Sequence, residues 1–470
     1  MRPEFFSLIQ PQHSATGMYR PQDRTEQGTL WIPAHEIPRA SATSFYGRLH
    51  DQLEKIGFGE YLRQACRPYS DDSGTGRPGV DPEVFLRMLM VGFFENLASE
   101  RAIASRCADS IEIRAFLGYS LAERTPDHST ISRFRSRIPE EVFFSAFEFI
   151  LKALKGSKLL RGRHLGIDAS VIEANASLAS LVNRLTQQDY QTYIAGLAKE
   201  AGVDPGDEQA VRAFDRKRKG KKTSNDQWKN PHDEDARIGR DKHGATRMLY
   251  KPEHVVDMES GAIIDVRVRH GDEGDAADLF TRLGEAEDRI NRVLERGADE
   301  ASVETATADK GYYKTEEITN LQHAGVETLI PSPACERNLE ELSEAQRLAV
   351  IRAEVMTSCE AGRAFMRRRG QHVERSFAHV LDAGGLRRTT LRGRANIEKR
   401  YVVGALCYNL SLLMRSLFGV GTPKQALATG WALVCALIPA FRRGAEVLRV
   451  VFRWLGALAG GHCRNQSAFG

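Results

Sequence analysis

The chain has 470 residues, of which 41% are hydrophobic and 27% charged. This composition is ordinary for a globular protein, and the length allows about two to four domains. The net charge of +4 arises from 66 basic and 62 acidic residues. Because the two signs are nearly balanced, only local clusters of charge can indicate a binding partner.

Three further features exclude other classes of protein. The seven cysteines are odd in number and include no Cys-x-x-Cys pair, which argues against a disulfide framework or a structural zinc site. The N-terminus lacks the apolar core of a secretory signal. The apolar run GWALVCALIPAF is shorter than the roughly 20 residues that span a bilayer. We therefore expect a cytoplasmic protein that does not bind a membrane.

The first third of the chain has helical patterns and no strand pattern. Residues 1–40, rich in Pro, Gln, Thr and Gly, are expected to form a polar arm. Within DPEVFLRMLMVGFFENL the apolar residues follow helical spacing, and Asp81-Pro82 is a good helix start. TPDHSTISRFRSRI predicts another helix, with Asp127 as its N-cap. An all-helical domain is therefore expected over 41–155.

Strand patterns begin near His164. HLGIDASVIEA, SVETATAD and VETLIPS each read as a strand, and KPEHVVDMESGAIIDVRVRHG reads as two strands joined at Ser260-Gly261. Helical stretches lie between and after them, which predicts an α/β domain with a mixed sheet over 158–420. A basic, polar insertion at about 200–245 interrupts this domain, and a helical tail is expected over 421–470.

Three acidic residues lie at positions where α/β enzymes usually have catalytic residues, at the ends of strands or on a helix that packs on the sheet. Strand alternation puts Asp168 on the face opposite Leu165 and Ile167, and Asp309 ends a later strand. Glu374 borders the apolar stripe of a helix. Carboxylates gathered at one sheet edge suit metal-assisted phosphoryl transfer, because Mg²⁺ prefers oxygen ligands. A strand-end Asp is also an ordinary turn residue, and spacing does not choose among the other acids nearby, which are Asp257, Asp265, Asp272, Asp275 and Asp278.

The residues around the three acids carry a family resemblance. GIDAS, ATADKGYY and HVERSFAHVLDAGGLRRTTLRGRANIEKRYVVGALCYNL resemble the DDE transposases of bacterial insertion sequences. DPEVFLRMLMVGFF, SERAIASRCADSIEIRAFLGY and TPDHSTISRFR resemble the helical DNA-binding domain that precedes their catalytic domain. The similarity extends over roughly residues 40–415 in the same order.

The resemblance implies an RNase H-like catalytic domain and a metal-binding catalytic triad of Asp168, Asp309 and Glu374. It implies Mg²⁺ or Mn²⁺ as cofactor. The expected reaction is cleavage of the ends of the element and their joining to target DNA. Double-stranded DNA, as terminal inverted repeats and as target, is the expected partner. The resemblance also implies a homo-oligomer that holds two paired ends of the element. The expected location is the bacterial cytoplasm, in association with the nucleoid.

Basic clusters are the candidates for contacts with DNA phosphates, because cations supply most of the affinity for DNA. The alternative for each is a solvated surface residue or a salt bridge. Trp228 is expected to anchor the insertion to the core, or else to stack on an unpaired base. The predicted DNA-binding residues are Arg133, Arg135, Arg137, Arg216, Lys217, Arg218, Lys219, Lys221, Lys222, Lys310, Arg375, Arg394 and Lys399.

Two rival functions stay open. A DNA endonuclease of the same fold would use the same carboxylates to cut without joining. A catalytically inactive, transposase-derived DNA-binding protein would still bind DNA, but its catalytic domain would no longer cut it. The presence of all three acids argues against the inactive protein.

Overall fold

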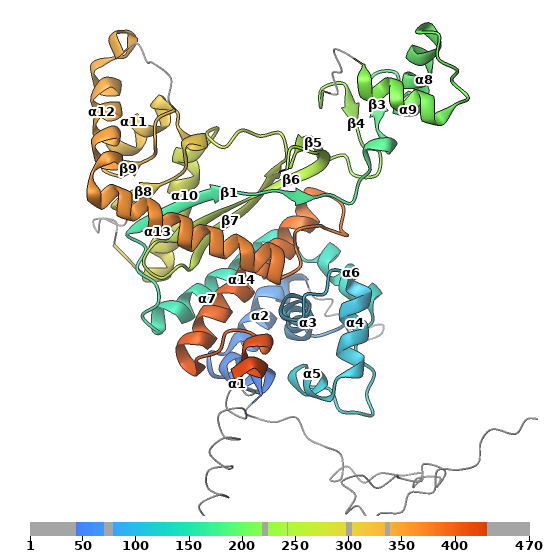
Figure 1. The fold of residues 1–470 in the computed structure, drawn as a ribbon. Helices are drawn as coiled ribbons and strands as arrows, with labels where there is room; N and C mark the ends of the chain where they lie inside the picture. Colours follow the sequence, from blue (N-terminus) through green and yellow to red (C-terminus); the bar gives the residue numbers. More distant parts are fainter. Residues whose placement is uncertain are drawn as a thin grey trace, which may run out of the picture. The chain divides into compact units, whose positions relative to one another are not determined.

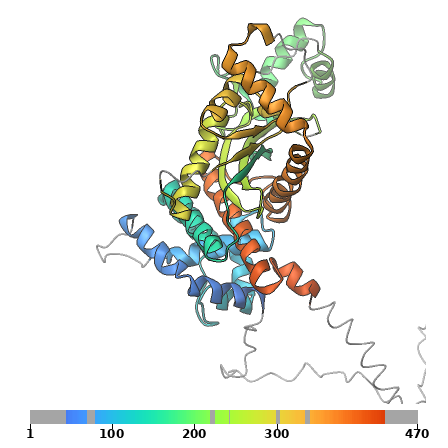
Figure 2. The same ribbon diagram turned by 90° about the vertical axis from the view of Figure 1, so that its left-hand side faces the viewer.

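The computed structural model describes residues 44–69, 79–218, 224–241, 243–297, 303–333 and 339–429 (Figures 1 and 2). The predicted arm over 1–40 lies outside the described residues. So do residues 430–470, which make up most of the predicted tail.

The described residues before the first strand are helical, as their apolar spacing predicts. Asp81 caps α3 by accepting a hydrogen bond from the Glu83 amide at 2.8 Å, and Pro82 takes the first helical position. Asp127 caps α6 in the same way, through the Thr130 amide at 2.9 Å. The helices are α1 (Phe45–Lys55), α2 (Phe58–Cys66), α3 (Pro82–Phe94), α4 (Glu100–Asp109), α5 (Ile111–Phe116), α6 (His128–Arg137) and α7 (Glu140–Gly156).

A mixed sheet follows, in which the central strand β1 is parallel to β8 and antiparallel to β6. β8 is parallel to β9, and β6 is antiparallel to β7, which gives the order β7–β6–β1–β8–β9. This is the predicted RNase H-like sheet. The expected first strand is split at Ser170 into β1 and β2, and β5 extends the sheet beside β6. The strands are β1 (His164–Ala169), β2 (Ile172–Glu173), β5 (Arg237–Arg240), β6 (Thr246–Asp257), β7 (Ile263–His270), β8 (Thr305–Thr307) and β9 (Glu327–Leu329).

Helices pack on the sheet and beside it. α13 contacts β1, β6, β8 and β9, and it continues into a π-helical turn, Ala378–Ala383. α10 lies on the other face, where its Arg282 reaches Glu253 of β6. The helices are α10 (Leu279–Leu294), α11 (Thr315–His323), α12 (Glu344–Ser358), α13 (Glu360–Phe377) and α14 (Arg394–Phe418).

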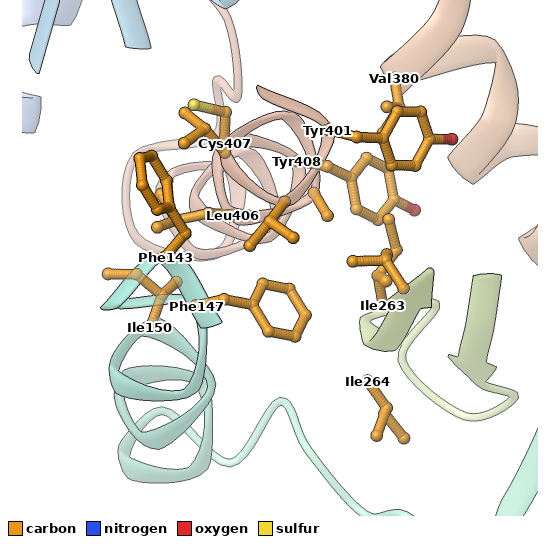
Figure 3. Packing of buried hydrophobic residues seen from close by; sticks show 14 of the residues in the cluster. Phe143, Phe147, Ile150, Ile263, Ile264, Val380, Tyr401, Leu406, Cys407 and Tyr408 are labelled. Atoms are coloured by element: carbon orange, nitrogen blue, oxygen red, sulfur yellow. The ribbon is translucent and has the colours of Figure 1, made fainter. Parts of the chain in front are cut away.

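One hydrophobic core joins the N-terminal helices to the sheet. In Figure 3, Phe147 of α7 and Leu406 of α14 lie beside Ile263 of β7. Asn409 of α14 adds hydrogen bonds to both the amide and the carbonyl of Ile263, at 3.0 and 2.8 Å. This packing accounts for the apolar character of α14. Within the described residues, Arg394–Thr429 is long and apolar enough to cross a membrane, but its most apolar window is 67% buried inside the protein.

The inserted segment has regular structure and begins before residue 200. β3 (Val182–Asn183) pairs with β4 (Trp228–Lys229), and α8 (Tyr190–Glu200) and α9 (Glu208–Lys217) lie between them in the chain. Trp228 is only 3% exposed, and its ring packs on Tyr190 and Tyr193 at centroid distances of 5.1 and 5.3 Å. The tryptophan therefore packs against helix α8 of the insertion, and it also belongs to the hydrophobic core that includes the sheet, as expected for a residue that anchors the insertion.

Candidate active site

Asp168 lies near the carboxyl end of β1, on the face covered by α13. Gly166 shares this face, and a Cβ built on it would lie 2.5 Å from Met258 Sδ and 3.2 Å from Val373 Cγ2. The absence of a side chain at Gly166 therefore lets α13 approach β1 closely. As a result Arg369, on the same helix as Val373, reaches Asp168, and its Nη1 donates to Asp168 Oδ2 at 3.1 Å.

Asp309 lies beside Asp168 because β1 and β8 run parallel in a constant register. His164 pairs with Thr305 and Gly166 with Thr307, so the same register, continued by two residues, places Asp309 next to Asp168. The Asp309 backbone is extended, as this continuation requires. Its Oδ1 accepts from the Gly311 amide at 2.7 Å and caps the 3₁₀ turn Lys310–Tyr312. Asp309 thus caps a turn and also faces a second carboxylate.

The electrostatic environment of Asp168 is that of a partly buried acid close to another acid. Burial raises its pKa, while the Arg369 guanidinium and the Ala169 amide, which donates at 2.8 Å, act in the opposite direction. The negative charge of Asp309 raises the pKa of Asp168 further. Such a site favours a nearby cation, which would relieve the repulsion between the two carboxylates.

Glu374 is exposed on α13, directly after Val373. Its side chain lies over its own helix, since a Cβ on Gly370 would be 3.7 Å from Glu374 Oε1. Among the described residues, no three acidic, histidine or cysteine side chains form a group that could hold a metal ion. The structure therefore brings Asp168 and Asp309 together and places Glu374 on the covering helix, without joining it to the two aspartates.

The competing acids have other partners. Asp257 accepts from the Arg161 amide and the Ser260 hydroxyl in the β6–β7 hairpin, and Asp265 pairs with Arg282 on the opposite face of the sheet. Asp275 differs in position, because its Oδ2 would lie 3.3 Å from a Cβ on Gly311, beside the Asp309 turn. It forms an ion pair with Lys251.

Behind Asp168, a buried histidine links the sheet to two helices. His254 pairs with Asp168 across β1 and β6, and its ring stacks on Phe377 at 4.0 Å. The Tyr401 hydroxyl and Ser376 Oγ each lie 2.7 Å from one of its ring nitrogens. The Ser376 hydroxyl donates to the Val373 carbonyl, so it accepts from His254, which in turn accepts from Tyr401. Burial lowers the pKa of His254 to about 3 and keeps the ring neutral, as this chain requires.

Sequence reasoning did not identify Arg369 or His254. Arg369 belongs to the run RRRG shortly before HVERSF, and this run was a usable signal. His254 lies in a strand with no motif around it, so only the cross-strand register reveals its position beside Asp168.

The predicted DNA-binding residues fall into several groups. Arg135 and Lys399 are 5% and 8% exposed; Arg135 pairs with Glu100, and Lys399 Nζ donates to the Arg135 carbonyl at 3.1 Å. This burial argues against a phosphate contact for either residue. Arg218 and Arg394 are partly buried and form ion pairs within their own helical segments. Lys219, Lys221 and Lys222 lie outside the described residues. The exposed members are Arg133, Arg137, Arg216, Lys217, Lys310 and Arg375.

Comparison with known proteins gives two matches to transposase domain models. The transposase domain model DUF772 matches residues 39–137, and the transposase DDE domain model matches residues 207–410. The second match contains Asp309 and Glu374, whereas Asp168 precedes it. A search of the curated proteins found no match. DDE transposase domains act on DNA and generally use divalent metal ions. The two matches together cover more than half of the chain, in the order helical domain then catalytic domain, and the protein belongs to the insertion-sequence DDE transposases.

Proposed function

We propose that this transposase cuts the ends of its element and joins them to target DNA by phosphoryl transfer at Asp168, Asp309 and Glu374. One observation carries the proposal. The register of the parallel strands β1 and β8 puts two aspartates side by side at their carboxyl ends, beneath the helix that bears Glu374. In open α/β sheets, this end of the strands is the usual place for chemistry.

The donor set fits a divalent cation of the magnesium type. Carboxylate oxygens are the ligands that Mg²⁺ and Mn²⁺ accept, and Arg369 already balances the charge of Asp168. Asp168 and Asp309 would hold the ion, and Glu374 would join them after a rotation of its exposed side chain away from Gly370. When bound, such ions make an attacking oxygen more nucleophilic and stabilise the leaving oxygen.

The chain's own groups have separate tasks in this proposal. Asp168 and Asp309 keep a concentrated negative charge at one point of the sheet edge, and Arg369 offsets it until the ion is bound. Lys310, exposed on the turn after Asp309, would contact DNA phosphates next to the site, and Arg375, exposed on α13, would contact a phosphate farther along the DNA. Arg133 and Arg137 of α6 would contact DNA outside it. A homo-oligomer that holds two ends together is part of the proposal.

The test uses the purified full chain with Mg²⁺ and DNA that carries the inverted repeats flanking its own coding region. Asp168→Asn, Asp309→Asn and Glu374→Gln should each lower the cleavage rate by about 10³-fold or more, and DNA binding should stay near the wild-type level. Glu360→Gln is the matched control, because Glu360 is an exposed acid at the start of the same helix. It lies about 20 Å along α13 from Glu374.

The outcome of this test distinguishes the three candidate functions. Cleavage followed by joining supports the transposase mechanism, cleavage without joining supports the endonuclease, and binding alone supports an inactive DNA-binding protein. Full cleavage by Asp309→Asn would contradict the proposed active site, because Asp309 is one of the two aspartates that the strand register brings together.

A further inference from the structure

Tyr312 lies at the end of the turn that Asp309 caps. The Tyr312 amide donates to the Asp309 carbonyl at 3.2 Å, and the Gly311 amide donates to Asp309 Oδ1 at 2.7 Å. These two bonds tie the carboxylate of Asp309 and the backbone of Tyr312 into one short unit. The ladder of β8 ends at Thr307, two residues before Asp309, so the regular sheet does not itself hold this unit.

The side chain of Tyr312 is buried on the face of the sheet opposite α13. Tyr312 is 1% exposed, and its hydroxyl donates to Glu253 Oε1 at 3.0 Å. Glu253 is fully buried and also accepts from Arg269 Nη1 at 3.1 Å and from Arg282 Nε at 2.9 Å. Hydrogen bonds to a charged acceptor are stronger than neutral ones, and two guanidinium groups fix the position of this acceptor.

We propose that Tyr312 is a positioning residue for Asp309, which it holds beside Asp168 through its hydrogen bond to Glu253. This inference rests on the proposed function. Two neighbouring carboxylates repel each other, and a turn beyond the end of a three-residue strand gives way easily. The bond to Glu253 opposes that movement from the far side of the sheet. Glu253, Arg269 and Arg282 are thus the anchor of the Asp309 turn.

Tyr312→Phe tests the proposal, because it removes one hydroxyl and leaves Glu253 with both arginines. Tyr250→Phe is the matched control. Tyr250 lies on the same strand as Glu253, is fully buried, and donates to Asp233 Oδ1 at 2.6 Å, but it has no bond to the Asp309 turn. The measurement is Mn²⁺ binding to the full chain, followed by electron paramagnetic resonance. Binding that is lost in Asp309→Asn defines the site.

We expect Tyr312→Phe to weaken Asp309-dependent Mn²⁺ binding by about 10-fold, as is common for groups that orient a metal ligand. Tyr250→Phe should bind Mn²⁺ as the wild type does. Equal weakening in both variants, no weakening in Tyr312→Phe, or no Asp309-dependent binding in the wild type would each overturn the proposal. So would a Tyr312→Phe chain that does not fold, if Tyr250→Phe folds.

This readout separates the inference from the proposed function. A wild-type chain that binds Mn²⁺ through Asp309 but neither cuts nor joins DNA would overturn the proposed function and leave the role of Tyr312 supported. Cleavage by the wild type, together with unchanged Mn²⁺ binding in Tyr312→Phe, would support the proposed function and overturn the role of Tyr312.

Discussion

A methyl group on Gly166 would test whether α13 must lie close to β1. In Gly166→Ala the new Cβ would lie 2.5 Å from Met258 Sδ, 3.2 Å from Val373 Cγ2 and 3.5 Å from Arg369 Cγ. Met258 and Val373 are both 0% exposed, so neither has free space to move into. Overpacking of this kind costs about 1–3 kcal/mol. The lower entropy of the unfolded alanine chain offsets about 0.4–1 kcal/mol, which leaves a net loss of about 1–2 kcal/mol.

The effect on activity should exceed the effect on stability. α13 carries Arg369 and Glu374, so a helix pushed away from β1 changes their distance from Asp168. A displacement of about 1 Å at a catalytic group costs up to about 10²-fold in rate. We therefore expect cleavage by Gly166→Ala to fall by about 10- to 100-fold, while affinity for DNA is retained.

The assays are urea unfolding, cleavage of terminal-repeat DNA, and DNA binding. Gly284→Ala is the matched control, because Gly284 lies inside α10 and a Cβ there would meet no atom within 4 Å. This control should gain up to about 1 kcal/mol from higher helix propensity and keep its activity. Wild-type stability and cleavage in Gly166→Ala would refute the reasoning, since the close approach of α13 would then be unnecessary.

Two further predictions concern charge. Arg133→Gln should reduce the slope of log K against log salt for DNA binding by about 0.9, whereas Lys399→Gln should leave the slope unchanged, because Lys399 is buried; equal changes in both variants would contradict this. His254, with its pKa lowered to about 3, stays neutral in the folded chain while the unfolded chain takes up a proton below about pH 6.5. Its contribution to stability is therefore complete above that pH and falls by up to about 1.4 kcal/mol per pH unit as the pH decreases toward 3. Urea unfolding at pH 5 and 7 should show a weaker pH dependence in His254→Gln, and an unchanged dependence would contradict the assignment.

Local patterns predicted most of the elements around the site. Caps such as Asp81 and Asp127 depend on side-chain bonds to amides two or three residues away, so the sequence contains the whole interaction. The β6–β7 hairpin was predicted for the same reason, because both strands flank one turn. α12 and the helices of the insertion were not predicted. α9, for instance, has no buried residue, and its polar sequence resembles a loop.

The sequence by itself determined the family, the order of the two segments and the three acids on which the proposed chemistry depends, since motifs and periodicity are local properties of the chain. Only the tertiary structure decided which charged groups face solvent. It buried Arg135 and Lys399, paired Asp168 with Arg369, and anchored Tyr312 on Glu253. Burial and pairing depend on contacts between residues far apart in the chain, and here the register of β1 and β8 and the approach of α13 over Gly166 set those contacts.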